Sequence, residues 1–335
     1  MRLVRKLKNK VILLISILLL LSLLFIYIPA LVDSSQLYKA KNHIIVVIDG
    51  TRYSETWGDQ ERRNIPNLAN LLAPLGVLFT NFNNFGVTRT ISGHTALITG
   101  FYEELNNSGK EYPSNPSILQ RWLKLSAESR EKAWFITSKG KLAALTDTKD
   151  EEWNGMFVPS HHCGVNGLGL EAGLGGKGYR DDSETWIQVK RILREFHPRL
   201  VMINFKNPDT FPSEKGWDAY LQAIQQSDDY VYQLWQLLEE DHFYRNQTAL
   251  YITSDHGRHL DGHEDGFLSH GDDCRGCQHV SLLAIGPDFR KGAVVTEQYE
   301  LIDLPVTIGK MLCLDIPGSK GRFMQTLFTE KENAN

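Results

Sequence analysis

Acidic and histidine side chains stand at positions in the sequence where they could bind metal ions. Asp49 follows the apolar run HIIVVI, and Asp255 and His256 form the central pair of TSDHG. Asp209 lies in NPD, shortly after another apolar run, and His270 lies in SHGD. Two-metal hydrolytic sites use about six Asp and His ligands of this kind, carried on the ends of different strands. Each of these residues taken singly could equally be an ordinary turn or surface residue. The prediction of a metal site therefore depends on their convergence.

A loop rich in Thr and Ser, GVTRTISGHTALITG at residues 86–100, is predicted to supply a nucleophile. The loop leads into a short predicted helix, and Thr90 stands at the start of that helix. A hydroxyl at a helix N-terminus gains from the helix dipole and from free backbone N–H groups. Thr88 or Ser92 could serve only as helix caps. Arg89 is interpreted either as a contact to substrate oxygens or as a solvated side chain.

The stretch SHGDDCRGCQH, residues 269–279, combines two histidines with two cysteines. Many zinc sites use a Cys-x-x-Cys pair, but here the histidines flank the cysteines at a spacing unlike that of the usual sites. In an exported domain we interpret Cys274 and Cys277 as a tight disulfide, or as thiols paired with Cys163 or Cys313. We expect such a link to stiffen the loop that presents the histidine of SHG.

Strand-like and helix-like segments alternate along the chain. Short, β-branched apolar runs predict strands that are buried on both faces, at residues 43–50, 133–138, 200–205, 249–257 and 280–288. Helical patterns are found at residues 117–128, 182–196 and 217–240, with Ser117 and Ser183 as the expected caps of the first two. This alternation predicts an α/β domain with a largely parallel sheet, whose ligands gather at the carboxyl ends of the strands.

Together these residues resemble the alkaline phosphatase superfamily, and in particular its nucleotide pyrophosphatase/phosphodiesterase and threonine-nucleophile phosphatase branch. The resemblance covers most of residues 43–290. It rests on VVIDG, TRTISGHTALITGFY, NPD, TSDHG, and SHG followed by HVSLLAIGP, in the family's order. The resemblance implies an alkaline-phosphatase-like central sheet, mixed and mostly parallel, flanked by helices. It also implies two divalent metal ions, commonly zinc, at the strand ends.

Carried over to this chain, the resemblance implies that Thr90 attacks the substrate and forms a phosphothreonine that water hydrolyses. The metal ligands that it implies are Asp49, Thr90, Asp255 and His256 at one ion, with Asp209 and His270 at the other. In this branch an asparagine after the nucleophile helix binds a phosphoryl oxygen, and either Asn106 or Asn107 could take that role. The chain lacks the Cys/Ser-x-Pro-x-Arg motif, which disfavours a formylglycine sulfatase.

One departure from the family's pattern puts the second metal ion in question. Asp209 is followed by TFPS, so that Ser213 stands where the family has a metal-binding histidine. A serine hydroxyl is a poorer zinc ligand than an imidazole. Three explanations stay open. In the first, another histidine takes the place of the missing one, namely His161, His162, His259 or His263. In the second, the site uses one ion, or binds the second ion weakly or as a harder ion. In the third, the protein has lost turnover.

The N-terminal sequence predicts a membrane anchor. Residues 1–10 carry five positive charges and no acid, and residues 11–32 form an uncharged apolar run long enough to span a bilayer. The positive-inside rule predicts a cytoplasmic N-terminus. A tether at residues 33–42 and one catalytic domain at residues 43–330 would then lie in the periplasm or outside the cell. A cleaved signal peptide is the alternative.

The net charge of the chain limits which class of molecule it is expected to bind. The net charge is −4, and it becomes −4 − 5 = −9 without the basic N-terminal residues, which argues against nucleic acid. We expect a membrane-anchored, extracytoplasmic, metal-dependent phosphohydrolase, either a phosphomonoesterase or a phosphodiesterase/nucleotide pyrophosphatase. Its substrate would be a phosphorylated small molecule, a nucleotide or a lipid head group. The alternatives are a phospho-alcohol transferase on lipid or glycan acceptors, and a sulfatase-like protein that binds phosphorylated ligands without catalysis.

Overall fold

The computed structural model describes residues 38–166, 168–169 and 178–329 of the 335-residue chain. The chain divides into two units after Leu37, and the described residues belong to the second. The predicted basic flank and apolar span, residues 1–32, lie outside the described residues together with residues 33–37 of the tether, so the anchor stays a prediction. Within the described ranges, no helix is both long and apolar enough to cross a membrane.

A ten-stranded sheet forms the centre of this unit. The strands are β1 (Asn42–Ile48), β2 (Val77–Asn83), β3 (Ala133–Thr137), β4 (Ser160–Cys163), β5 (Leu168–Gly169), β6 (Leu200–Phe205), β7 (Thr248–Thr253), β8 (His279–Ile285), β9 (Ala293–Val295) and β10 (Tyr299–Glu300). Their order is β10-β2-β8-β7-β1-β6-β3-β4-β5, with β9 beside β2. The contacts of β8 with β2 and β7, and of β5 with β4, are antiparallel, and the other pairs are parallel. The predicted mixed, mostly parallel sheet is confirmed.

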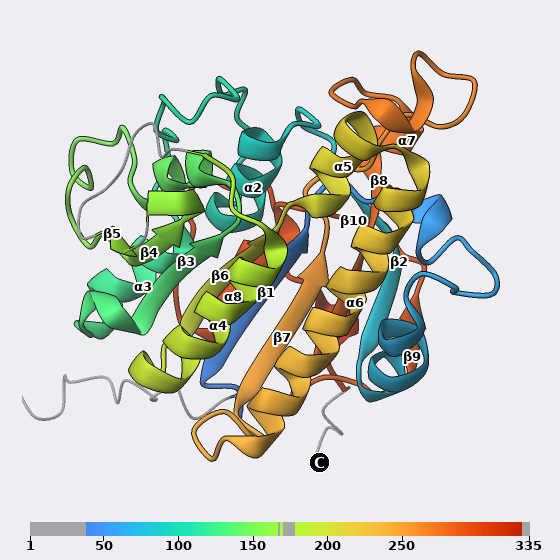
Figure 1. Ribbon diagram of the computed structural model, residues 1–335. Helices are drawn as coiled ribbons and strands as arrows, with labels where there is room; N and C mark the ends of the chain where they lie inside the picture. The colour runs from blue at the N-terminus through green and yellow to red at the C-terminus, as the bar shows by residue number, and fades with distance from the viewer. Residues whose placement is uncertain (1–37, 167, 170–177, 330–335) are drawn as a thin grey trace, which may run out of the picture. The chain divides into compact units, whose positions relative to one another are not determined.

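Helices cover both faces of the sheet (Figure 1). The α-helices are α2 (Thr90–Thr99), α3 (Ile118–Ser126), α4 (Asp182–Phe196), α5 (Asn207–Lys215), α6 (Trp217–Glu240), α7 (Arg275–Gln278) and α8 (Asp303–Met311). Apolar side chains of α4 and α6 join one buried cluster, and those of α2, α3 and α8 join another on the opposite face. The sheet is therefore the middle layer of three.

β1 shows why a continuous apolar run forms a central strand. All seven of its residues are buried, and its side chains alternate between the two clusters. Ile44, Val46 and Ile48 pack in one cluster, whereas Ile45 and Val47 pack in the other. Because both faces of the strand are covered, both sets of alternate positions are apolar from Ile44 onward, and polar residues stand only at the start of the strand, at Asn42 and His43.

The structure confirms the five predicted strands and the three predicted helices, and it corrects one helix cap. Ser117 caps α3 through a complete capping box with Gln120. Ser183, however, lies inside α4, and its backbone N–H donates to the side chain of Asp181. Asp181 has the extended backbone that a cap needs, with φ −62° and ψ 148°, so Asp181 is the cap of α4.

The strand order explains how acidic residues far apart in the sequence meet. β7, β1 and β6 are neighbours and run parallel, so their carboxyl ends lie at one edge of the sheet. Asp49 directly follows β1, Asp255 follows β7 by two residues, and Asp209 lies in the first turn of α5 after β6. The predicted convergence at the carboxyl edge of the sheet is thus present.

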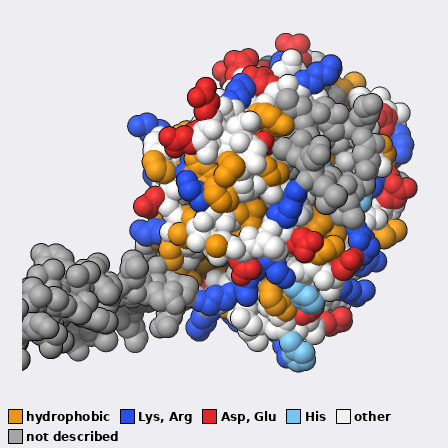
Figure 2. All heavy atoms as spheres, turned by 90° about the vertical axis from the view of Figure 1, so that its left-hand side faces the viewer, with side chains coloured by type: hydrophobic (Ala, Val, Ile, Leu, Met, Phe, Trp, Pro, Cys, Tyr) orange, Lys and Arg blue, Asp and Glu red, His pale blue; other side chains and the backbone are white. Residues whose placement is uncertain are grey.

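The face of the molecule shown in Figure 2 carries charges of both signs, interspersed with apolar side chains. No large field of basic side chains is visible among the coloured residues of this face.

Replacing Ser117 by Ala is expected to lower the free energy of unfolding by about 1 kcal/mol, because the hydroxyl that accepts from the backbone N–H of Gln120 is lost. Ser129→Ala is the matched control, since Ser129 precedes a short helix without making a side-chain cap bond. Urea unfolding of both variants measures the difference. Equal loss in both would contradict the capping role of Ser117.

Candidate metal centre

Thr90 is the first residue of α2, and its side chain faces the carboxyl edge of the sheet. Arg89 before it has an extended backbone, and Thr90 is almost completely buried. Gly93, one turn later, allows α2 to approach β7: a Cβ atom there would lie 2.5 Å from the carbonyl oxygen of Asp255. The glycine thus sets the distance between the Thr90 hydroxyl and the acidic residues that follow the strands.

Three buried ligand atoms converge beside Thr90 without hydrogen-bond partners. They are Asp49 Oδ1, Asp255 Oδ2 and His256 Nε2. The Nε2 atom lies 3.3 Å from Asp255 Oδ2 and 3.6 Å from Asp49 Oδ1. A buried polar atom without a partner costs free energy, so three together indicate that a cation belongs among them. Gly50, with φ +67°, makes the turn that brings Asp49 to this place.

The imidazole of His256 is held in the tautomer that a metal ligand needs. Its Nδ1 atom lies 2.9 Å from the carbonyl oxygen of Gly257, so Nδ1 carries the proton and Nε2 keeps its lone pair. Burial lowers the pKa of His256 to about 3, which keeps the ring neutral at physiological pH.

Two further residues support these ligands from behind. His94 Nδ1 lies 2.8 Å from the carbonyl oxygen of Thr90, and Asn204 Nδ2 lies 3.1 Å from His94 Nε2. The same amide donates to Asp49 Oδ2 at 2.8 Å. Because both ring nitrogens of His94 are engaged within the protein, we interpret His94 as a support of α2, although it lies close enough to Asp49 and Asp255 to form a group with them.

Asp209 is neutralised by two cationic side chains of the protein itself. Arg258 Nη1 donates to Asp209 Oδ1 at 2.6 Å, and Lys139 Nζ donates to Asp209 Oδ2 at 2.5 Å. Burial raises the pKa of Asp209, but the charge of Lys139 and the hydrogen bond of His270 outweigh burial, and the pKa lies well below its usual range. Asp209 is therefore a carboxylate that already has counter-ions.

Lys139 places its ammonium group between the two acidic sites. Its Nζ atom lies 3.0 Å from Asp49 Oδ2 and donates to Thr90 Oγ1 at 2.9 Å. Burial by itself lowers the pKa of Lys139, but the carboxylates of Asp209, Asp49 and Asp255 raise it above its usual value. Lys139 thus stays an ammonium, and it bonds the Thr90 hydroxyl from the position between Asp49 and Asp209.

His270 reaches the same centre from the loop between β7 and β8. Its Nδ1 atom lies 2.7 Å from the carbonyl oxygen of Thr88, and its Nε2 atom lies 3.2 Å from Asp209 Oδ1. The ring stacks on that of His256, with centroids 3.8 Å apart. The ligand atoms of Asp209, His256 and His270 form a second group that could bind a metal ion. The carboxylate of this group, however, is already bonded to Lys139 and Arg258.

The structure distinguishes the two candidate asparagines. Asn107 Oδ1 accepts from the backbone N–H of Ile91 at the start of α2, and also from Lys141 Nζ at 3.0 Å. Asn106 is exposed, and its Oδ1 accepts from the backbone of Ser108 instead. Asn107 is therefore the one placed at the N-terminus of α2, whereas Asn106 points away from it.

The arginine beside Thr90 faces the outer part of the centre. Arg89 is exposed and lines an open cleft with His270 and Gly271. Its guanidinium lies next to Gly271, where a Cβ atom would approach Arg89 Nε to 3.3 Å. Arg89 is thus available to a substrate that enters from the cleft.

A lysine, rather than one of the four proposed histidines, stands beside Asp209. Ser213 is exposed, and its hydroxyl donates to the carbonyl oxygen of Thr210. The histidines have other neighbours: His161 is on β4, His162 contacts Arg180, His259 contacts Asp265 and Asp272, and His263 contacts Asp272. Lys139 Nζ is thus the group that lies against Asp209 Oδ2 in this structure.

None of the four cysteines, all in the described part of the chain, forms a disulfide. The structure therefore differs from the predicted Cys274–Cys277 disulfide and from a pairing with Cys163 or Cys313. Cys163 is buried on β4, at the other side of the sheet from β8. Cys274 and Cys277 instead lie at the two ends of one turn around α7, with His259 and Asp272 beside them.

The residues present fit one metal ion better than two. Asp49, Asp255 and His256 offer buried ligand atoms without partners, and two carboxylates with an imidazole suit a divalent cation such as zinc. At the other position Asp209 is already paired with Lys139 and Arg258. The metal identity is not fixed by this donor set.

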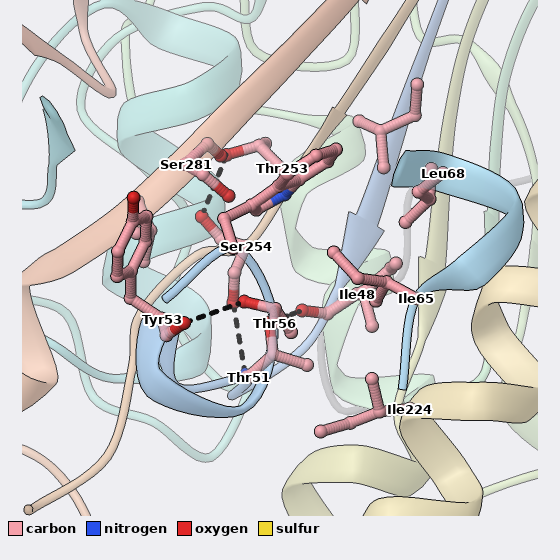
Figure 3. Close-up of a pocket in the computed structure, with 13 residues that line it drawn as sticks. Ile48, Thr51, Tyr53, Thr56, Ile65, Leu68, Ile224, Thr253, Ser254 and Ser281 are labelled. Carbon is pink, nitrogen blue, oxygen red and sulfur yellow. Dashed lines mark hydrogen bonds between the residues drawn. The ribbon is translucent and has the colours of Figure 1, made fainter. Parts of the chain in front are cut away.

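A separate small cavity lies behind the turn that follows β1 (Figure 3). Its volume of about 30 Å³ has room for roughly one water molecule. Thr51 closes it on one side by donating its backbone N–H to Ser254 Oγ at 3.3 Å. The cavity is lined mainly by apolar residues and hydroxyls, so it braces the turn that carries Asp49 and is too small for a substrate.

Sequence reasoning missed Lys139, Lys141 and Arg258. Lys139 and Lys141 lie in SKGK, directly after the predicted strand at residues 133–138, and Arg258 follows SDHG. The rule that drew attention to acids at the carboxyl ends of strands applies equally to basic residues there. That signal was present, because β3 is parallel to β6 and ends at the same edge of the sheet.

Comparisons with known proteins agree with this fold. Residues 114–259 match the model of the family described as type I phosphodiesterase / nucleotide pyrophosphatase. No curated protein matches the sequence significantly. The matched residues include Lys139, Asp209, Asp255 and His256.

Several solved structures share the fold at low sequence identity. Murine ectonucleotide pyrophosphatase/phosphodiesterase 5 superposes with a TM-score of 0.61 at 14% identity, over 86% of this chain and 100% of that one. A phosphonate monoester hydrolase of Silicibacter pomeroyi has a TM-score of 0.61 at 14% identity, over 88% and 78% of the two chains. A sulfatase of Pseudoalteromonas has a TM-score of 0.61 at 16% identity, over 87% and 72%.

A protein of the alkaline phosphatase superfamily from Vibrio parahaemolyticus is also similar, with a TM-score of 0.57 at 18% identity over 85% of this chain and 69% of that one. The resemblance indicated by the sequence motifs is thereby confirmed. The chain has the fold of the alkaline phosphatase superfamily, and it matches the type I phosphodiesterase/nucleotide pyrophosphatase family over residues 114–259.

Proposed function

We propose that this chain is a metal-dependent phosphoester hydrolase in which Thr90 is the nucleophile. One divalent ion would be held by Asp49, Asp255 and His256, and the ammonium of Lys139 takes the place of a second ion. The observation that carries the proposal is the convergence of three buried, unpartnered ligand atoms on a threonine hydroxyl at a helix N-terminus. A cation and a helix dipole beside a hydroxyl both favour its ionised, nucleophilic form.

Lys139 has a defined part in this reaction. Its ammonium donates to Thr90 Oγ1, so negative charge that develops on that oxygen is stabilised before and during attack. A bound divalent ion would supply Lewis acidity beside the same oxygen. Thr90 Oγ1 would form a bond to phosphorus as the ester oxygen leaves, and water would then cleave the phosphothreonine and restore the hydroxyl.

Asn107 and Lys141 are placed to hold the phosphoryl oxygens. Asn107 uses its Oδ1 atom for the bonds from Ile91 and Lys141, which leaves its amide N–H groups for an acceptor. Arg89 adds a guanidinium on the side of the open cleft. These donors surround the N-terminus of α2, where an anion is favoured by the helix dipole.

The comparisons support this class of substrate. The family model describes phosphodiesterases and nucleotide pyrophosphatases. The murine ectonucleotide pyrophosphatase/phosphodiesterase 5 has been solved in complex with AMP as an inactive Thr→Ala variant. We therefore propose a nucleotide or another small phosphorylated molecule as the substrate of this chain, to be tested with aryl phosphate monoesters and diesters in parallel.

Thr90→Ala is expected to lower kcat for an aryl phosphate ester by at least about 1,000-fold, because the attacking oxygen is removed. Thr99→Ala makes the same chemical change at the other end of α2 and is expected to keep most of the activity. Melting temperatures of both variants check that they are folded. Turnover by Thr90→Ala close to that of the parent protein would rule out the proposed nucleophile.

Lys139→Ala is expected to raise the metal content of the protein by one ion per chain. Without the ammonium, Asp209 Oδ2 would be free to bind a second ion together with His270, since His256 Nε2 belongs to the first ion. Elemental analysis after dialysis against zinc measures the change. Lys206→Ala is the control, because Lys206 is also buried but bonds to Asn207 and Thr210. An unchanged metal content in Lys139→Ala would contradict the role of the ammonium.

The pH dependence of kcat/KM is expected to show the titration of Lys141. Burial lowers the pKa of Lys141 to about 8, with the charge of Lys139 acting in the same direction. Below pH 8 the protonated amine would bind a phosphoryl oxygen, and above pH 8 this contact is lost, so kcat/KM falls as pH rises.

Lys141→Met should lose about 10- to 100-fold in kcat/KM at pH 7, which corresponds to one charged hydrogen bond, and should lack the step near pH 8. Lys149→Met is the matched control, since Lys149 is partly exposed and pairs with Glu111. A step that persists in Lys141→Met would assign the titration to another group.

A further inference from the structure

The connection between β7 and β8, residues 254–278, contains a second cluster of metal-binding side chains outside the centre described above. The cluster consists of His259, Asp272, Cys274 and Cys277, each of which offers one ligand atom. These four atoms all lie within 4.8 Å of one another. With metal–ligand bonds of about 2.0–2.3 Å, ligands of one zinc ion lie roughly 3–4 Å apart, so only a small contraction separates the cluster from a closed site.

His259 is oriented toward this cluster by a carboxylate on its other side. Its Nδ1 atom lies 3.1 Å from Asp265 Oδ1, which fixes the proton on Nδ1 and leaves the lone pair on Nε2. The residue is 6% exposed, and Nε2 is buried without a hydrogen-bond partner, 3.3 Å from Asp272 Oδ2. Histidine ligands of metal ions have this second carboxylate partner as a rule.

The cysteines lie on a turn that brings both side chains to the same side. Cys274 caps α7, and its carbonyl oxygen accepts from the backbone N–H groups of Cys277 and Gln278, both at 3.0 Å. Cys277 is completely buried. Cys-x-x-Cys turns of this kind supply two thiolates to tetrahedral zinc sites.

Asp272 is held between this turn and a second histidine. Its Oδ1 atom accepts from the backbone N–H of Cys274 at 3.1 Å, and its Oδ2 atom lies 2.8 Å from His263 Nε2. His263 is partly exposed and outside the group of four. It therefore orients Asp272 in the way that Asp265 orients His259.

We propose that His259, Asp272, Cys274 and Cys277 bind a structural zinc ion. Two thiolates, one imidazole and one carboxylate are a soft to borderline donor set that suits zinc and is poor for magnesium or calcium. Four protein ligands leave no open coordination position, as is typical of structural zinc rather than catalytic zinc. The site is independent of the proposed hydrolytic function.

The zinc ion would close the loop that presents His270. His259 and Asp272 stand on either side of that histidine in the sequence, and both would be fixed to the Cys274–Cys277 turn. The turn already packs against the strand end: Gly257 N–H donates to the carbonyl oxygen of Cys277 at 2.7 Å. A Cβ atom on Gly276 would lie 2.4 Å from the carbonyl oxygen of Arg258, so the two segments touch directly.

A disulfide between Cys274 and Cys277 is the competing arrangement. A disulfide would hold the same turn but would leave His259 Nε2 buried without a partner, which is unfavourable. It would also leave unexplained why Asp265 and His263 orient the imidazole and the carboxylate toward the sulfur atoms. Zinc satisfies all four side chains together.

The test uses the full-length chain, purified without chelators and loaded with cobalt(II) in place of zinc. Thiolate ligation of cobalt gives an intense charge-transfer absorption in the near ultraviolet, which a site built from carboxylates and imidazoles lacks. We expect this absorption in the parent protein and also in His256→Ala, which weakens the other centre. Activity is not needed for this readout.

Cys274→Ser/Cys277→Ser is expected to lose the absorption and one zinc ion per chain, and Cys313→Ser, an exposed cysteine outside the cluster, is expected to keep both. His259→Ala serves as a second variant that leaves the cysteines in place, and it should lower zinc affinity at least about tenfold. A Cys274–Cys277 disulfide in mass mapping of the parent protein, or a cobalt spectrum without the thiolate absorption, would overturn the proposal.

Discussion

The contacts of the Lys139 ammonium with Asp49, Asp209 and Thr90 are the interaction on which the rest of the site depends. Buried carboxylates are tolerated only when they are paired, and Asp49 and Asp209 are brought together by the neighbouring strands β1 and β6. With Asp255, three carboxylates face two protein cations, Lys139 and Arg258. The remaining charge of −1 matches a single divalent ion, which would leave the site positive toward a phosphate.

This balance explains the unusual sequence after Asp209. A histidine at the position of Ser213 would compete for a place that the ammonium already occupies, and a second divalent ion would lie against Lys139. The exposed Ser213, whose hydroxyl donates to the carbonyl oxygen of Thr210 within α5, is compatible with the lysine arrangement. In the proposed site, the ammonium of Lys139 takes the place of a second metal ion, and the histidine that would bind that ion is absent at position 213.

Much of the fold was predictable because its central strands are buried on both faces. Continuous apolar runs identified β1, β3, β6, β7 and β8. β2, with the sequence VLFTNFN, is interrupted by polar residues, and β5, β9 and β10 have two or three residues each, too few for a pattern. The antiparallel direction of β8 depends on tertiary pairing, which no local sequence pattern carries.

The candidate site was predictable where a residue of a metal-binding or nucleophilic type stands in a recognisable motif, as at the ends of the predicted strands. Asp49, Thr90, Asp255, His256 and His270 lie together as the motifs indicate. The choice between Asn106 and Asn107 was not predictable from the sequence, because these neighbouring loop residues are of the same type and differ only in the direction of their side chains. The thiols of Cys274 and Cys277 were misread as a disulfide for a similar reason: the sequence does not show that His259 folds back onto them.

The antiparallel direction of β8 has a consequence for how this protein can vary. A chain that leaves β7 and returns as an antiparallel neighbour starts and finishes at the same edge of the sheet, so it needs no helix to cross to the opposite edge. All 25 residues between the two strands therefore form one connection at the edge of the sheet where Thr90 lies. Insertions or deletions there would reshape the entrance while the hydrogen bonds of the sheet stay as they are. Within this connection the exposed residues 260–264 could diverge at little cost to folding, whereas residues 254–259 are buried and include two ligands of the candidate metal centre.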